Sequence, residues 1–173
     1  MKLLTVTVPC YNSQDYMEKC IQSLLPGGNR VEIIIIDDGS KDNTGKIADE
    51  YARKFPDIVR VIHQENGGHG EGINQGLKHA TGTYFKVVDS DDTLSPKFLD
   101  ALEECERQGG VDMVVTNYYY VHSDGDGDRS INYSAVLPEN RIFTWEDTKP
   151  FRVYQMLTIH SSTFRTEIMR KWE

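Results

Sequence analysis

The sequence predicts an α/β fold with a mostly parallel sheet covered by helices on both faces. Apolar, β-branched runs alternate with segments of helical periodicity through roughly the first two thirds of the 173 residues, the order that βαβ units produce. The run at 31–36 is aliphatic at nearly every position, as in a strand buried on both faces. Polar clusters follow several predicted strands, at the edge where open α/β sheets bind ligands.

The predicted elements begin with a strand at Leu3–Val8 that ends at Pro9. Ser13 is a candidate N-cap for the helix that follows, whose apolar positions recur at helical spacing as far as Leu25. Pro26-Gly27-Gly28 ends that helix. The next expected elements are a strand at Val31–Ile36, a helix at about Thr44–Lys54 and a strand at Ile58–His63.

A glycine-rich loop leads into the second group of elements. Ser95-Pro96 is a typical helix start, with Ser as N-cap and Pro at the first helical position, and Gly109-Gly110 ends that helix. After it we expect a smaller mixed β region. The remaining expected elements are a helix at Ile73–Ala80, strands at Tyr84–Val88 and Met113–Val121, a polar turn at Asp124–Asp128, a returning strand at Ile131–Val136 and a helix opening at Thr166–Trp172.

Composition indicates one globular domain and argues against nucleic-acid partners. The hydrophobic fraction is 38%, the charged fraction 27% and the net charge −8, whereas nucleic-acid backbones require a basic face. No stretch approaches the roughly 20 apolar residues of a membrane span. Cys10, Cys20 and Cys105 show neither zinc spacing nor a disulfide framework, which predicts buried free thiols and a reducing cytoplasm.

An apolar strand that runs into three carboxylates predicts a metal site. The Tyr84–Val88 strand is followed by Asp89, Asp91 and Asp92. Clustered carboxylates repel one another unless a cation lies between them, and oxygen ligands of this kind suit Mg²⁺ or Mn²⁺ rather than zinc.

Four polar segments follow predicted strands and would meet at one sheet edge. Tyr11 offers a flat face for a base, Asp38 can accept hydrogen bonds from a pyrimidine, and Asp91 can bind a cation that bridges a diphosphate. Together they predict a nucleotide site. The four segments are Pro9–Asn12, Asp37–Ser40, Asn66–Asn74 and Asp89–Asp92.

Several of these segments also have a purely local interpretation. Asp37–Ser40 can be a turn before the next helix. Asn66–Gly72 can be a flexible loop with His69 at its surface, and it lacks the dinucleotide fingerprint because Ile73 occupies the third glycine position.

Two further motifs do not support the function that each first suggests. The Asp124–Asp128 run fails as a calcium loop because Arg129 stands at the glycine position and Ala135 at the terminal Glu position. His160, with two serines after it, has no third partner or nucleophile elbow to make a hydrolase site.

The motifs, in this order, resemble those of the family 2 glycosyltransferases, which have the GT-A fold. The resemblance covers roughly residues 3–108 and continues more weakly to Arg165. The matching segments are Val6-Thr-Val-Pro-Cys-Tyr-Asn12, Ile36-Asp-Asp-Gly-Ser40, Asn66-Gly-Gly, Asn74-Gln-Gly-Leu77, and Ala80-Thr-Gly-Thr-Tyr-Phe leading into Asp89-Ser-Asp-Asp92.

The resemblance implies a role for individual residues. Asp89 and Asp91 match the D-x-D motif and would bind Mn²⁺ or Mg²⁺, with Asp91 as the direct ligand and Asp92 as a structural residue near the Ser95 helix start. Asp38 would bind the uracil base. The full set expected at a nucleotide-sugar is Pro9, Tyr11, Asn12, Asp38, Gly67, Gly68, Asn74 and Ser90.

Two departures from the family pattern affect the expected activity. Ile73 replaces the Arg that many members carry before the helix asparagine. The catalytic base usually lies in an acidic pair after the segment that is Phe164-Arg165 here, and the sequence ends at Glu173. The resemblance therefore implies a truncated chain whose base lies beyond Glu173. Residues 1–110 would form the donor-binding subdomain and 111–173 the incomplete start of an acceptor-side subdomain.

The implied function is metal-dependent, inverting transfer of a sugar from a nucleotide-diphospho-sugar, expected to be a UDP-sugar. The acceptor would be a saccharide or a lipid-linked molecule in cell-surface polysaccharide synthesis. We expect a cytoplasmic location, with the full-length protein peripherally bound at the inner face of the membrane. The alternatives are a catalytically incomplete nucleotide-sugar-binding module and a nucleotidyltransferase, for which Tyr11–Gln14 lacks a basic triphosphate loop. The sequence specifies neither the sugar, the linkage nor the oligomeric state.

Overall fold

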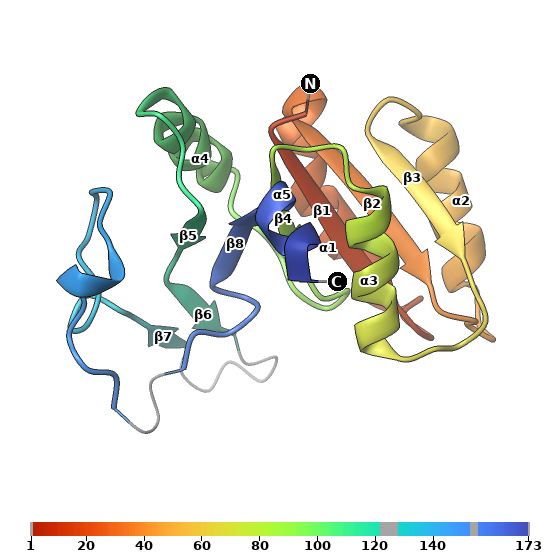
Figure 1. Cartoon of the computed structure of the whole chain (residues 1–173). Helices are drawn as coiled ribbons and strands as arrows, with labels where there is room; N and C mark the ends of the chain where they lie inside the picture. The colour runs from red at the N-terminus through yellow and green to blue at the C-terminus, as the bar shows by residue number, and fades with distance from the viewer. Residues whose placement is uncertain (1, 122–127, 153–155, 173) are drawn as a thin grey trace.

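A computed structural model describes residues 2–121, 128–152 and 156–172 of the chain (Figure 1). Its main sheet has six strands in the order β3-β2-β1-β4-β8-β5, of which the first four are parallel and β8 is antiparallel to both neighbours. The predicted mostly parallel α/β arrangement is confirmed. The strands are β1 (Leu4–Cys10), β2 (Val31–Asp37), β3 (Val59–His63), β4 (Tyr84–Val87), β5 (Met113–Val115) and β8 (Ser162–Arg165).

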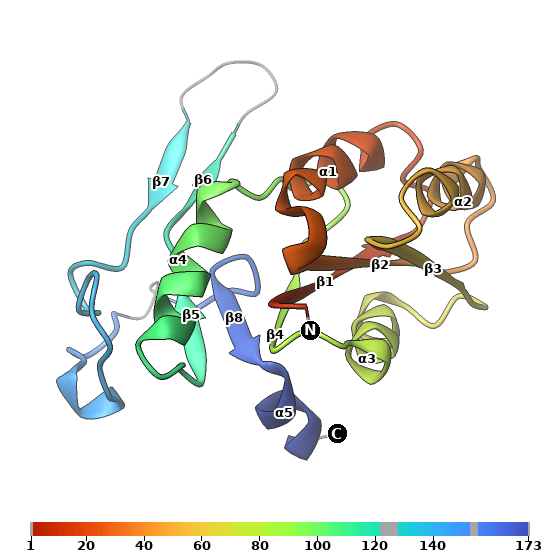
Figure 2. The ribbon, with the colours of Figure 1, turned by 90° about the horizontal axis from the view of Figure 1, so that it is seen from above.

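Helices cover both faces of this sheet. Figure 2 shows α1 and α2 on one face of β1, β2 and β3, and α3 on the other. The apolar side chains of α4 join the core on the α1 face. The helices are α1 (Met17–Leu24), α2 (Thr44–Lys54), α3 (His69–His79), α4 (Lys97–Arg107) and α5 (Thr166–Met169), with 3₁₀ turns at Leu25–Arg30, Trp145–Asp147 and Arg170–Trp172.

The two central strands are buried along their whole length. Every residue of β1 and β2 is buried, as expected for parallel strands with helices on both faces. Alternate residues of β1 from Leu4 to Cys10 pack toward α1 and α4. The opposite face carries a smaller cluster built from Leu77, Phe85 and Val87.

Glycine allows α3 to approach the sheet closely. A Cβ added at Gly76 would overlap the side chain of Thr7 on β1, and one at Gly72 would lie 3.3 Å from the Cβ of Pro9. Because Thr7 is a β-branched residue inside a buried strand, it has little freedom to move aside. The separation between α3 and β1 is therefore set by these two glycines.

The structure corrects the predicted starts of three helices. Ser13 does not cap α1; Tyr16 precedes that helix, and the Ser13 hydroxyl contacts the Ser90 hydroxyl at 3.0 Å instead. α3 begins at His69 rather than Ile73, so part of the glycine-rich loop is helical. α4 begins at Lys97, with Pro96 rather than Ser95 at the cap position.

The predicted strand at Met113–Val121 is wrong because the chain changes sheets within it. The Thr116 backbone N–H donates to the Ser161 carbonyl at 2.9 Å, and the Asn117 side chain accepts from the Tyr133 backbone at 3.0 Å. The chain then enters a separate two-stranded sheet rather than continuing in the main one. This small sheet pairs β6 (Tyr118–Tyr120) with β7 (Arg129–Ile131), so the hairpin partner lies earlier than Ile131–Val136.

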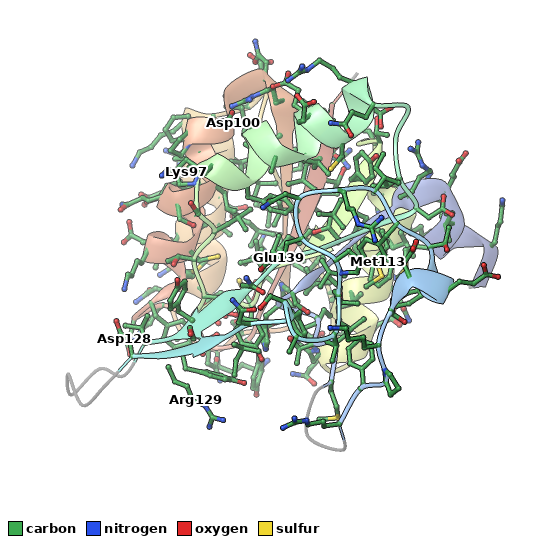
Figure 3. All side chains as sticks on the ribbon, turned by 90° about the vertical axis from the view of Figure 1, so that its left-hand side faces the viewer. Lys97, Asp100, Met113, Asp128, Arg129 and Glu139 are labelled. Carbon is green, nitrogen blue, oxygen red and sulfur yellow. The ribbon has the colours of Figure 1, made fainter. Side chains whose placement is uncertain are left out.

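The second half of the chain packs beside α4. In Figure 3, Lys97 and Asp100 lie on α4 above the small sheet, where Asp128 directly precedes β7 and Arg129 begins it. Arg30, after α1, donates to Asp100 and to Glu103, each at 3.0 Å.

The predicted turn at Asp124–Asp128 lies outside the described residues except for its last residue. No helix in the described part of the chain is long and apolar enough to cross a membrane.

Candidate functional site

The carboxyl ends of β1, β2 and β4 meet the loop after β3 at one edge of the sheet. Cys10 is in register with Asp37, and Asp37 with His63. The Asp38 backbone N–H donates to the Cys10 carbonyl at 2.9 Å. The contact between the Ser13 and Ser90 hydroxyls joins the end of β1 to the turn after β4. The four polar segments are thus brought together, as the parallel topology predicts.

Asp38 organises the glycine loop through its carboxylate. One of its oxygens accepts hydrogen bonds from the Gln64 side chain at 2.7 Å and the Gly67 backbone at 2.8 Å, and the other accepts from the Gly68 backbone at 2.9 Å. Burial alone would raise the pKa of Asp38, but these three hydrogen bonds outweigh it and lower that pKa. The carboxylate is therefore charged and held in a fixed orientation.

Asp37, next to Asp38, holds a second set of contacts. Its carboxylate accepts from the Ser40 backbone at 3.1 Å and lies 2.9 Å from Nδ1 of His63. Nε2 of His63 lies 3.0 Å from Asp49. Hydrogen bonds to Asp37 and then Asp49 raise the pKa of His63, against the opposing effect of burial.

Asn12 connects the end of β1 to the turn after β2. It adopts a positive φ of 51°, a conformation that Asn tolerates better than most residues. Its backbone N–H donates to the Ser40 hydroxyl at 3.1 Å, and its side chain accepts from the Lys41 backbone at 2.8 Å. The exposed ring of Tyr11, 51% accessible, stands directly before it.

Two histidines approach the acidic cluster from distant parts of the chain. Nε2 of His69, at the start of α3, lies 2.8 Å from Asp89. Nδ1 of His160, just before β8, lies 3.0 Å from Asp92 and 3.9 Å from Asp89. The site therefore combines carboxylates from the end of β4 with imidazoles from two other segments.

The electrostatics around Asp92 differ from those at Asp38. Burial and the neighbouring charges of Asp91 and Asp89 raise the pKa of Asp92, while the charge and hydrogen bond of His160 lower it; the net effect is a rise. A carboxyl group in such surroundings favours a nearby cation, because a positive charge relieves the repulsion among the acids.

This group of side chains fits a divalent cation. Carboxylate oxygens of Asp89 and Asp92 and a ring nitrogen of His160 all lie within 4.8 Å of one another. Carboxylates suit Mg²⁺ and Mn²⁺, and an added imidazole suits a transition-metal ion such as Mn²⁺ better than Mg²⁺. The acidic and histidine side chains could therefore hold a metal ion.

The predicted site residues differ in how closely they join these contacts. Pro9 lies one residue before the end of β1, next to Gly72, and Ser90 is buried against Ser13. Asn74 is exposed on the second turn of α3, and Asp91 is exposed in the turn between Asp89 and Asp92. Neither Asn74 nor Asp91 takes part in the contacts described above.

Sequence reasoning missed the involvement of His160 and undervalued His69 and Asp92. His160 precedes β8, which pairs antiparallel beside β4 although it lies far along the chain. No local pattern signals that pairing. His69 reaches the acidic cluster because α3 begins at this residue. The neighbouring glycines, which are poor helix formers, hid that early helix start from the sequence prediction.

Cys10 and Cys20 belong to the hydrophobic core, as predicted, whereas Cys105 lies outside it. Cys10 and Cys20 are buried, and Cys105 is partly buried; all three are free thiols. Burial, and then the charge of Asp37, raises the pKa of Cys10 to about 12. A thiol that stays protonated is a poor nucleophile, so Cys10 supplies packing rather than chemistry at this edge.

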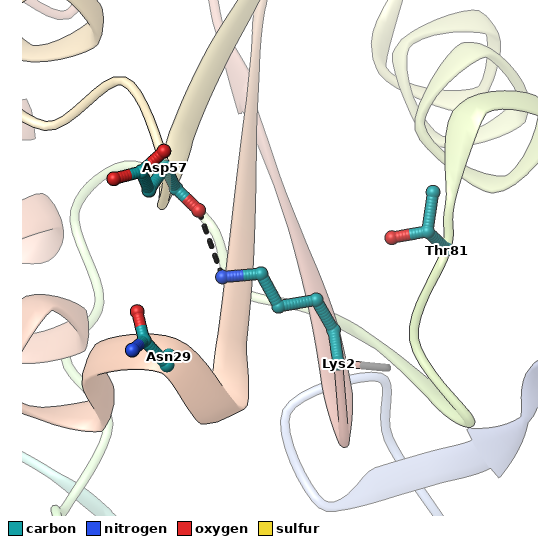
Figure 4. A pocket seen from close by; sticks show the side chains of 4 residues that line it. All are labelled: Lys2, Asn29, Asp57 and Thr81. Carbon is teal, nitrogen blue, oxygen red and sulfur yellow. Dashed lines mark hydrogen bonds between the residues drawn. The ribbon is translucent and has the colours of Figure 1, made fainter.

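A shallow depression at the other end of the strands has no comparable chemistry. It is lined by Lys2, Asn29, Asp57 and Thr81, and the Lys2 ammonium donates to the Asp57 carbonyl at 2.8 Å (Figure 4). Each of these residues precedes the start of a strand. It therefore lies at the amino edge of the sheet, where parallel sheets do not bind their ligands.

Comparison with known proteins places the chain in a family. Residues 5–169 match the family model described as glycosyl transferase family 2. The chain belongs to this family. It is 37% identical over 163 residues to the uncharacterized glycosyltransferase EpsJ of Bacillus subtilis, covering 94% of this chain and 45% of EpsJ. It is 39% identical over 128 residues to the glycosyltransferase GlyG of Streptococcus pneumoniae, covering 72% of this chain and 42% of GlyG.

A solved structure supports the fold of this family 2 chain. Staphylococcus aureus TarS, residues 1–349, in complex with UDP-GlcNAc, superposes with a TM-score of 0.77 and 26% identity, covering 99% of this chain and 47% of that one. The GT-A fold implied by the resemblance is confirmed. The chain spans a little under half the length of EpsJ, of GlyG and of TarS 1–349.

Proposed function

We propose that this family 2 chain is the donor-binding part of a metal-dependent, inverting glycosyltransferase that uses a UDP-sugar. The observation that carries the proposal is the juxtaposition, at one sheet edge, of an exposed aromatic ring, a glycine loop held by Asp38 and a group of side chains that could hold a cation. These three features suit the base, the sugar-phosphate linkage and the diphosphate of a nucleotide-sugar. The complex of TarS with UDP-GlcNAc supports this choice of donor.

The nucleoside end would lie between Tyr11 and Asp38. The exposed ring of Tyr11 suits stacking against a base. Asp38 directs three of its roughly four acceptor positions at the loop, which leaves one for an N–H of uracil. Pro9 and Asn12 would shape the wall beside the base, and Ser90 would support the turn below it.

The phosphate end would lie at the start of α3. The backbone N–H groups of Gly67 and Gly68 donate hydrogen bonds to the Asp38 carboxylate, so these glycines would act by holding the loop in place. The first turn of α3 supplies further backbone N–H groups, which a helix N-terminus presents to anions. This turn offers the charge compensation that Ile73 cannot provide.

The cation would be held by the acidic cluster and His160. We assign Asp89 and Asp91 as its carboxylate ligands from the D-x-D motif. Asp92, 3.0 Å from Nδ1 of His160, would fix the imidazole and leave its other ring nitrogen for the cation or a diphosphate oxygen. A bound Mn²⁺ or Mg²⁺ supplies Lewis-acid stabilisation of the charge that develops on the departing diphosphate.

The acceptor side and the catalytic base would come from residues beyond Glu173. A base must reach the acceptor hydroxyl to remove its proton, and we infer that an acidic residue beyond Glu173 does so. The acceptor would be a saccharide or lipid-linked molecule in cell-surface polysaccharide synthesis. The three free cysteines support a reducing cytoplasmic location, and the full-length protein would act at the inner face of the membrane.

Titration calorimetry with UDP tests the donor half of the proposal. We expect Mn²⁺-dependent binding that EDTA abolishes, and a loss of affinity of roughly tenfold in Asp38→Asn, because a hydrogen bond to a charged group is lost. Asp57→Asn, at the amino edge of the sheet, is the matched control and should bind as the wild type does. Absence of UDP binding by the wild-type chain would overturn the proposal.

The match covers 45% of EpsJ and 47% of TarS 1–349, and donor binding alone, by a nucleotide-sugar-binding module without catalysis, is the second candidate function. Assays of sugar transfer and donor hydrolysis on the chain extended beyond Glu173 distinguish the two. Transfer by the extended chain supports the enzyme, whereas UDP binding without turnover supports the module.

A further inference from the structure

Lys86 places a positive charge in the protein interior beneath the candidate site. It lies within β4 and is only 2% exposed. Its ammonium donates to the carbonyls of His160 at 2.9 Å and Ser162 at 3.3 Å, and lies 5.6 Å from the centre of the Phe98 ring. The Lys86 side chain thus connects β4 directly to the backbone segment that carries His160.

These contacts lie where the pairing of β4 with β8 ends. The ladder runs through Tyr84 with Arg165 and Phe85 with Phe164. Beyond it, the side chain of Lys86, rather than a backbone N–H, supplies donors to the neighbouring segment. The carbonyl between the two, that of Ser161, accepts from Thr116 at 2.9 Å on the opposite side. Residues 160–162 are therefore fixed from both sides.

The fixed segment carries the imidazole of the candidate site. Nδ1 of His160 lies 3.0 Å from Asp92, and its ring centre is 5.7 Å from that of Tyr118. Asp89 and Asp92 follow Lys86 on the same stretch of chain. Lys86 belongs to the strand that leads into the acids, and its side chain contacts the loop that bears His160. It can therefore set the distance between the acids and the imidazole.

An ammonium is an unfavourable way to fill this position if packing is its only role. Burial lowers the pKa of Lys86 to about 8, although the charge of Asp92 opposes this shift. A methionine has a similar length and no desolvation penalty, and apolar residues that replace buried charges often preserve or increase stability. Donation to two backbone carbonyls is what the ammonium adds.

We propose that Lys86 is a positioning residue of the donor site, whose ammonium holds the His160 backbone so that the imidazole stays beside Asp92. The inference rests on the proposed function, because it assumes that His160 contributes to binding the cation and diphosphate. Lys86 itself touches neither group.

The test compares Lys86→Met and Lys86→Arg, alone and combined with His160→Ala. The first measurement is Mn²⁺ affinity in the presence of UDP, by electron paramagnetic resonance. The second is amide hydrogen exchange of residues 158–162 without metal or nucleotide. Lys54→Met, whose parent side chain is 64% exposed on α2, is the matched control. Denaturant unfolding of each variant separates loss of folding from loss of positioning.

We expect Lys86→Met to weaken Mn²⁺ binding roughly tenfold, as changes behind a metal ligand do, and to accelerate exchange at 158–162. Lys86→Arg should restore most of both, and in the His160→Ala background Lys86→Met should add little further loss. Unchanged Mn²⁺ binding by Lys86→Met, or an equal loss with and without His160, would overturn the inference alone. Absence of Mn²⁺ binding by the wild type would overturn the proposed cation site and this inference with it.

Discussion

At the level of single residues, Asp38 has a structural role within the chain. Its carboxylate fixes the loop through the Gln64 side chain and two glycine amides. The sequence allowed either a local turn or a base-binding residue at this position. The structure gives Asp38 a long-range role, since its partners lie after a different strand, and the local turn contact belongs to Asp37, which accepts from the Ser40 backbone.

Asp38→Asn should therefore reduce stability as well as donor binding. The NH₂ group of the new asparagine would face at least one N–H group that donates to the Asp38 carboxylate in the wild type. That N–H group would lose its acceptor, and a buried polar group left without a partner costs about 1–3 kcal/mol. Urea unfolding measures this loss. Gln64→Ala removes one partner and leaves the carboxylate in place, so it should cost less; an equal or larger loss in Gln64→Ala would contradict the role of Asp38.

The assignment of the metal carboxylates can be tested at Asp91 and Asp92. Asp91 is exposed and free to bind an ion, whereas Asp92 contacts His160 at 3.0 Å. If the D-x-D motif supplies the ligands, Asp91→Asn should weaken Mn²⁺ binding by at least roughly tenfold and Asp92→Asn by less. Manganese titration of both variants decides the question, and the reverse order would assign the ligand to Asp92.

His63 should make stability depend on pH. Its pKa is raised by hydrogen bonds to Asp37 and Asp49, so the protonated form stabilises the native state. That contribution is complete below the unfolded pKa of about 6.5 and disappears as the pH rises through the folded pKa. The side chain is 48% exposed, so the effect should stay under about 1 kcal/mol.

Comparison of His63→Asn with the wild type by urea unfolding at two pH values measures this effect. The variant should be less stable at pH 6 and nearly equal to the wild type at pH 9. His79→Asn, an exposed residue at the end of α3, is the control. A constant difference between His63→Asn and wild type across this range would contradict the account.

At the level of secondary-structure elements, local patterns predicted the helices and strands in which hydrophobic periodicity and residue propensity agree. The helix Thr44–Lys54 appears with the predicted bounds, because its apolar residues follow one period and its single glycine, Gly45, stands in the first turn. α3 begins earlier than predicted, because its glycines have low helix propensity but pack against β1. The strand at Met113–Val121 failed because Asn117 binds a distant backbone group, which propensity does not register.

Gly76→Ala tests whether close packing of α3 positions the site. The added methyl group would overlap Thr7, and overpacking of this kind costs about 1–3 kcal/mol. UDP binding should weaken as well, since α3 carries His69 and the first-turn amides. Gly70→Ala, in the same helix with open space at the Cβ position, is the control for stability. It should be neutral or stabilising by up to about 1 kcal/mol, whereas a neutral Gly76→Ala would contradict this packing role.

At the scale of the whole molecule, topology carries most of the functional prediction. A parallel sheet brings the ends of β1, β2 and β4 to one edge, so these segments could be grouped before any distance was known. The antiparallel addition of β8 beside β4 was not predictable in this way, and with it came His160. Residues that arrive by such late pairings have no periodic or spacing signal in the sequence.

We propose that a nucleotide diphosphate and a cation bind at the carboxyl edge of the sheet. Anomalous diffraction at the manganese edge, from crystals grown with UDP and Mn²⁺, tests it directly. We predict one Mn²⁺ peak at coordination distance, about 2–2.5 Å, from a carboxylate of the Asp89–Asp92 segment, with the diphosphate between that ion and the start of α3. A nucleotide bound at the amino edge, or a peak remote from these carboxylates, would contradict the account.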